Sequence, residues 1–96
     1  MATFIVLANF TDQGIRNVKE SPDRFEAYRA MAEKHGVVVK SVHYTVGRYD
    51  MAVVLQGSEE AVMATGLKSA TLGNVRSETL RGFSLDEMRK LVGLAP

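Results

Sequence analysis

The chain has 96 residues, 46% hydrophobic and 24% charged, and its 12 basic and 11 acidic residues leave a net charge of +1. This length suits a single domain over residues 1–96, because two separate cores would each be too small to be stable. The composition argues against disorder, and basic residues form no block or stripe, so nucleic acid is not an expected partner. The absence of cysteine excludes disulfides, thiolate metal sites and cysteine nucleophiles.

The segment Thr3–Phe10 predicts a first strand that is apolar on both of its sides. One alternating set consists of Phe4, Val6, Ala8 and Phe10, and the other contains Ile5 and Leu7. A strand of this kind is covered on both faces of its sheet. Its apolar run stops at Asn9, far short of the roughly 20 residues that span a bilayer, and no positively charged leader precedes it. We therefore expect a cytoplasmic protein with no membrane contact.

A first long helix is predicted to open at Ser21 and Pro22, after a turn at Thr11–Gly14 and a connector, Ile15–Glu20, that has no clear pattern. Serine can cap a helix, and proline is tolerated at the first helical position. Gly36 then follows the end of the helix, as is common for helix termini. The helix carries one apolar stripe at spacings of three and four, formed by Phe25, Tyr28, Met31, Ala32 and His35.

Two further apolar runs, from about Val37 to Val46 and from Met51 to Gln56, flank the short segment Gly47–Asp50. Glycine supplies positive φ and aspartate can bond nearby backbone amides, so the segment predicts a tight hairpin turn between two strands. By strict alternation His43 shares a face with Val39 and lies opposite Val42.

The second half of the chain predicts a helix, a strand and a last helix. Ser58 caps a helix that reaches about Ala70, with two carboxylates at its positive end. The strand Val75–Leu80 alternates polar residues, which suits the edge of a sheet. Ser84 and Glu87 have the spacing of a capping box, which predicts a helix from Leu85 to about Val92.

The element order βαββαβ, followed by the last helix, predicts an α+β, ferredoxin-like antiparallel sheet with both long helices on one face. The helices would then leave the other face uncovered, although the first and third strands are apolar on both sides. Self-association through that face is the economical solution, since an exposed apolar patch promotes aggregation. We expect a homodimer or a higher oligomer.

Two motifs resemble the GYD domain family: Gly47-Arg48-Tyr49-Asp50 before an apolar strand, and the block from Leu72 to Phe83. The segment Phe4–Gly14 is also similar to that family's N-terminus. The resemblance implies a ferredoxin-like subunit that pairs into a dimeric α+β barrel, in small bacterial proteins of largely unassigned role. Related families include cofactor-free monooxygenases, muconolactone isomerase-like enzymes, haem-dependent enzymes and amino-acid sensors, so the fold alone selects no function.

Six polar residues are candidates for ligand binding: His43, Tyr49, Asp50, Asn74, Arg76 and Glu78. An imidazole suits proton transfer or metal binding, but it is also compatible with an exposed position on an edge strand. Asp50 is either a ligand-binding carboxylate or a cap for the hairpin amides. Arg76 and Glu78 lie two apart on one strand face, where they either bind a small anion or form a surface ion pair.

Motifs for cofactors and metals are absent from the sequence. The glycines lack the spacing of a phosphate-binding loop, and His35 and His43 do not have metal-ligand spacing. We therefore expect no cofactor and no metal.

Three functions remain open. The first is a homo-oligomeric domain that binds a small molecule or assembles through its sheet face. The second is a cofactor-independent isomerase- or monooxygenase-like enzyme that uses His43, Tyr49, Asp50 and Arg76. The third is a purely structural oligomer.

Overall fold

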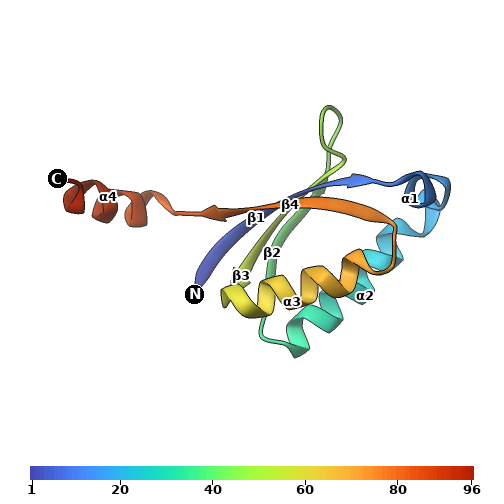
Figure 1. Ribbon diagram of the computed structural model, residues 1–96, viewed down its shortest axis with the longest axis horizontal. Coiled ribbons are helices and arrows are strands. Elements are labelled where there is room, and N and C mark those ends of the chain that lie inside the picture. The colour runs from blue at the N-terminus through green and yellow to red at the C-terminus, as the bar shows by residue number, and fades with distance from the viewer.

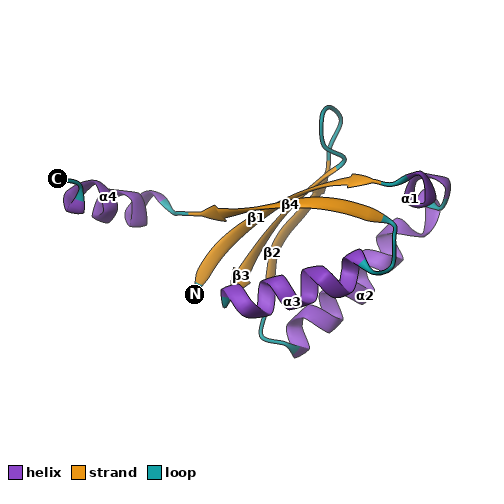
Figure 2. Cartoon of the chain, viewed as in Figure 1, coloured by secondary structure: helices purple, strands orange, loops and turns teal.

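A computed structural model describes residues 1–96 as one four-stranded antiparallel sheet with two long helices on one face (Figures 1 and 2). The strands β1 (Ala2–Phe10), β2 (Val38–Tyr44), β3 (Met51–Gly57) and β4 (Val75–Gly82) are arranged in the order β2-β3-β1-β4. The covering helices are α2 (Ser21–Lys34) and α3 (Glu59–Ala70). Three smaller elements complete the chain: α1 (Asp12–Arg16), a 3-10 turn at Val18–Glu20, and α4 (Leu85–Leu94). The ferredoxin-like fold expected from the element order is confirmed, with β4 at an edge of the sheet.

The core lies between the helices and one face of the sheet. It consists of eight buried side chains: Phe4, Ala8, Ala32, Val37, Met51, Val53, Leu55 and Val62. On β3 the side chains facing the helices are buried, whereas those between them are partly exposed. Only 13 of the 96 residues are buried, so a single chain encloses a small core for its length.

The opposite side of the sheet, which we call the open face, is covered by no helix (Figure 1). The strand registers place Ile5 between Val54 and Leu80, and Leu7 between Ala52 and Glu78. These side chains alternate with the core side chains along the strands, and they therefore point away from the helices. We define the apolar part of the open face by Ile5, Leu7, Ala52, Val54 and Leu80.

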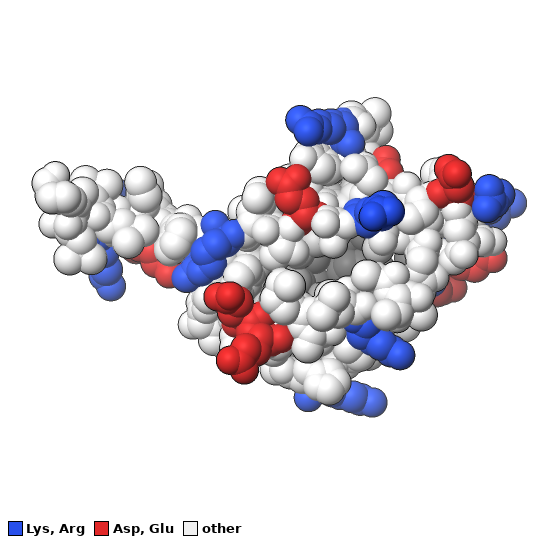
Figure 3. Space-filling model, viewed as in Figure 1, with Lys and Arg blue, Asp and Glu red and all other residues white.

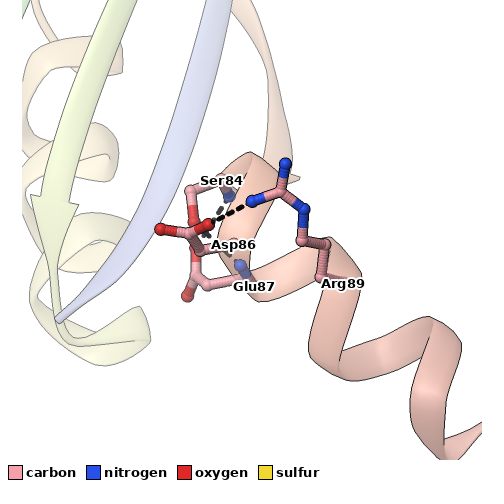
Figure 4. A network of polar contacts seen from close by, with 4 residues as sticks. All are labelled: Ser84, Asp86, Glu87 and Arg89. Carbon is pink, nitrogen blue, oxygen red and sulfur yellow. Dashed lines mark hydrogen bonds and ion pairs between the residues drawn. The ribbon is translucent and has the colours of Figure 1, made fainter.

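The helix α4 extends away from the body beyond the end of β4 (Figure 2), and the molecule measures 50 Å along its longest axis against 18 Å along its shortest. Its predicted capping box is present: the Ser84 hydroxyl accepts from the Glu87 amide at 3.1 Å, and the Ser84 amide donates to Glu87 Oε1 at 2.8 Å. Figure 4 also shows Asp86 paired with Arg89. The apolar side chains of α4 are all exposed, namely those of Leu85, Met88, Leu91 and Val92.

The hairpin between β2 and β3 differs from the prediction in two ways. A register shift between Val39 and Ser41 places an extra residue on β2, so Val39 pairs with Leu55 and shares the helix-facing side with Val42. The prediction that Val39 and His43 share a face is therefore wrong. The turn is also wider than expected, because the last strand pair joins Tyr44 to Met51 and residues 45–50 form an irregular loop.

The start of α2 is another correction. Ser21 does not cap the helix, because it already has helical dihedral angles and is the first residue of α2. Its hydroxyl is 2.8 Å from the Tyr44 hydroxyl, which links α2 to the end of β2. Ser58, in contrast, caps α3 as predicted, and its hydroxyl accepts from the Ala61 amide at 3.1 Å.

Candidate functional site

Three of the six predicted site residues meet at one end of the open face. Tyr49, Arg76 and Glu78 line an open hollow of about 290 Å³, and the Tyr49 hydroxyl donates to Glu78 Oε2 at 3.2 Å. We call this feature the tyrosine hollow; its other lining residues are Leu7, Asn9, Arg48 and Ser77. The guanidinium of Arg48 lies 5.7 Å from the centre of the Tyr49 ring, within the range of a cation–π contact.

Asp50 fixes the loop that carries Tyr49. Its carboxylate oxygen Oδ2 accepts from the amide of Phe10 at 2.9 Å, and its own amide donates to the carbonyl of Ala8 at 2.9 Å. The loop is also closed by Thr45, whose hydroxyl donates to the carbonyl of Tyr49 at 2.6 Å. Asp50 therefore forms hydrogen bonds with the end of β1 rather than with the amides of its own turn. Because β4 lies next to β1, these bonds hold Tyr49 close to β4.

Asn74 belongs to a separate structural junction. Its carbonyl accepts from the Thr11 amide at 3.1 Å, and its side-chain oxygen accepts from Gln13 Nε2 at 3.0 Å. The contact is close, because a Cβ on Gly14 would lie only 1.9 Å from the Asn74 carbonyl oxygen. These bonds attach α1 to the turn between α3 and β4.

His43 is exposed on β2, and two strands separate it from β4. With strands about 4.8 Å apart, the edge strands are about 14 Å from one another. One chain by itself therefore does not bring His43 together with Arg76 and Glu78.

The charges of the tyrosine hollow are not paired with one another. The structure has two ion pairs, Arg29 with Glu26 and Arg89 with Asp86, and neither involves Arg76 or Glu78. An unpaired guanidinium presents its donors in the fork geometry that matches a carboxylate or a phosphate. The hollow is therefore suited to polar contacts with a charged group. No group of three His, Asp or Glu residues is placed to hold a metal ion.

Four lining residues of the tyrosine hollow are absent from the predicted site: Leu7, Asn9, Arg48 and Ser77. Asn9 was detectable, because alternation from Ile5 and Leu7 puts it on the same face, and the register pairs it with Arg76. Arg48 had no such signal, since an arginine in a turn is normally solvated. No helix in the chain combines the length and the apolar character that crossing a bilayer requires.

The fold and its uncovered face define a class: small ferredoxin-like α+β domains with one bare sheet face. The GYD domain matches residues 4–92, and the chain therefore belongs to the GYD domain family, as the two motifs indicated. The chain is also 30% identical over 90 residues to a protein of Thermus thermophilus, the "Glutamine synthetase and cystathionine beta-lyase binding protein". That alignment covers 92% of this chain and 95% of the Thermus protein.

Proposed function

We propose that this chain is a homo-oligomeric protein-binding module whose copies pair through the open face. The observation that carries this proposal is the apolar surface formed by Ile5, Leu7, Ala52, Val54 and Leu80, which no element of the chain covers. Monomeric proteins rarely leave such a contiguous patch in water. A second sheet stacked about 10 Å away buries it and generates a dimeric α+β barrel.

The proposal includes α4 as part of the same assembly. A helix of 10 residues is too short to be stable alone in water, and this one has no large contact with its own chain. Its side chains Leu85 and Leu91 are 70% and 41% exposed. Such a helix becomes stable when its apolar side chains pack against another surface, and a second copy of the chain provides one. We therefore assign the apolar stripe of α4 to contacts between copies.

The protein partners that we propose follow from the similarity of this chain to the Thermus thermophilus protein. The Thermus protein is named for binding two enzymes, glutamine synthetase and cystathionine beta-lyase, and it aligns with nearly the whole of this chain. The first partners to test are therefore these two enzymes from the organism that encodes this chain.

A charge on the open face tests self-assembly. Val54 lies at the centre of this face, paired with Ile5 and Ser41, so Val54→Asp places a carboxylate in the proposed interface. We expect a dimer or larger species of the parent chain in sedimentation velocity at micromolar concentration, and a folded monomer for Val54→Asp. The matched control is Ala30→Asp on the exposed side of α2, which leaves the assembly unchanged. A parent chain that is monomeric at this concentration contradicts the proposal.

A second pair of variants tests α4 and the protein partners. Leu91→Asp charges the apolar stripe, whereas Lys90→Asp makes a larger charge change on the neighbouring residue. We expect Leu91→Asp to weaken self-association at least about tenfold, as one buried leucine contact is worth about 1.5–3 kcal/mol. Lys90→Asp should have little effect. Each variant and the parent are then passed over the two immobilised enzymes in a surface-binding assay. If the parent chain binds neither enzyme, the result contradicts the protein-binding part of the proposal.

A further inference from the structure

A cavity of about 310 Å³ lies on the helix-covered side of the sheet, away from the open face. It lies between α2, α3 and the strands β1, β3 and β4 and is partly open to solvent; Figure 3 shows it as a hollow between β4 and α3. Its wall is mainly apolar, since 13 of its 21 lining residues are hydrophobic. Large apolar side chains on this wall include Phe25, Tyr28, Met31, Val62 and Leu72.

Small side chains create this space. Gly66 lies in the middle of α3 and lines the cavity, and a Cβ at this position would meet no atom within 4 Å. On β4 the inward positions are occupied by Ser77 and Thr79, where a core strand would carry larger apolar groups. Glycine inside a helix costs about 0.5–1 kcal/mol relative to alanine. The fold therefore tolerates a helix-weakening residue at a position that borders the cavity.

The charges around the cavity have one sign. Arg24 and Lys68 are its only charged lining residues, and neither aspartate nor glutamate is among them. One Arg24 nitrogen, Nη1, donates to the carbonyl of Asn17 at 2.8 Å, which leaves its other donors for a ligand. Lys68 takes part in no ion pair. An apolar cavity with cationic groups at its margin complements a molecule with an apolar body and an anionic end.

Tyr28 contributes an uncharged side chain to the wall. Burial raises the pKa of Tyr28, and the nearby Thr65 hydroxyl offsets only part of this effect. The phenol therefore stays protonated throughout the physiological pH range, so it adds no negative charge that would repel an anion.

We propose that this cavity binds a small amphipathic carboxylate, with its alkyl chain or ring against the apolar wall and its carboxylate beside Lys68 and Arg24. The volume is near the lower end of small-molecule sites, which run from about 300 to 1,000 Å³, and suits a chain of about eight to ten carbons. This site goes beyond protein binding, because it lies on the other side of the sheet from the proposed interface. Both surfaces are therefore available at the same time.

The probes for the test are octanoate, 1-octanol and octylammonium, which share a chain but carry a negative, a zero and a positive charge. Binding is measured by calorimetry, and the site is located by amide chemical shifts of residues such as Tyr28 and Val62. We expect octanoate to bind at least about threefold more tightly than octanol, as one exposed ion pair allows, and octylammonium to bind most weakly. Equal affinities of octanoate and octanol overturn the anionic part of the proposal.

Two glycine variants test the location. Gly66→Leu adds a large side chain at the border of the cavity and replaces glycine with a better helix former, so the variant should fold; we expect it to reduce octanoate binding at least about tenfold. Gly93→Leu makes the same change on α4, where the added Cβ also meets nothing within 4 Å, and binding should be unchanged. Lys68→Gln should remove the preference for octanoate over octanol. Octanoate binding that survives in Gly66→Leu overturns the proposal. So does a parent chain that binds none of the three probes.

Discussion

The two faces of the sheet have similar side chains but opposite surroundings. On β3, Leu55 points to the helices and is 2% exposed, whereas Leu80 on the open face is 41% exposed. The same contrast separates the compact body from α4, whose apolar residues contact solvent. Apolar content therefore does not decide burial by itself, because a side chain is buried only where a second layer covers it. One chain supplies that layer for only one face.

The largest expected effect is a loss of stability on the covered face. Leu55→Ala removes a side chain from the core and is expected to lower the free energy of unfolding by about 2–5 kcal/mol. Leu80→Ala removes the same atoms from a half-exposed position and should cost less than about 1 kcal/mol. Both are measured by urea denaturation in the Val54→Asp background, so that self-assembly does not contribute. Equal losses would show that the two faces are equally buried within one chain.

A smaller effect is expected at Asp50, whose carboxylate accepts from the Phe10 amide at the edge of the tyrosine hollow. Asp50→Ala leaves this partly buried amide without its acceptor and should lower the free energy of unfolding by about 1–2 kcal/mol. Glu78→Ala is the matched control, because it removes an exposed carboxylate whose partner is another side chain. It should change stability by no more than about 0.5 kcal/mol. Similar costs for the two variants would mean that Asp50 has no special role in holding the loop.

The smallest effect is a pH dependence confined to α4. The Ser84 amide, which bonds Glu87, lowers the pKa of that carboxyl below its ordinary value. Because the pKa of Glu87 is lower in the folded helix than in the unfolded chain, the charged carboxylate stabilises α4. The full contribution is present at pH values above the pKa that Glu87 has in the unfolded chain. This contribution is lost as the pH falls through the lowered pKa. Amide-exchange NMR of the self-assembled parent chain, in which contacts between copies support α4, should show α4 fraying in acid.

Two variants check this assignment. Glu87→Gln should abolish the acid-dependent change in α4, whereas Asp86→Asn, which alters the carboxylate paired with Arg89, should keep it. Fraying that persists unchanged in Glu87→Gln would assign the pH dependence to another group.

The features that sequence analysis predicted well are those with local causes. The capping box at Ser84 and Glu87 and the cap at Ser58 each join residues three positions apart, and both are present. The edge position of β4 followed from its polar alternation, and the element order was enough to predict the sheet. The bond from Asp50 to Phe10 was not predictable in this way, because it spans 40 positions and depends on how β1 and β3 meet.

The candidate site shows the same division. Six residues were selected by type and position, but the structure brings only Tyr49, Arg76 and Glu78 together. His43 lies on the opposite edge strand because the strand order puts β3 and β1 in between. A bulge on β2 also changed which of its side chains face the helices, and alternation by itself cannot show where an extra residue interrupts the ladder.

The sequence alone determined the family, the fold class and the presence of an apolar surface in excess of what two helices can cover. These depend on periodicity, capping and motif residues, which act over a few positions of the chain. Only the tertiary structure decided which face stays bare, that α4 covers neither face, and that Gly66, Ser77 and Thr79 leave a cavity beneath α3. Those outcomes depend on the packing of segments far apart in the chain, where the size and direction of each side chain matter more than its place in a pattern.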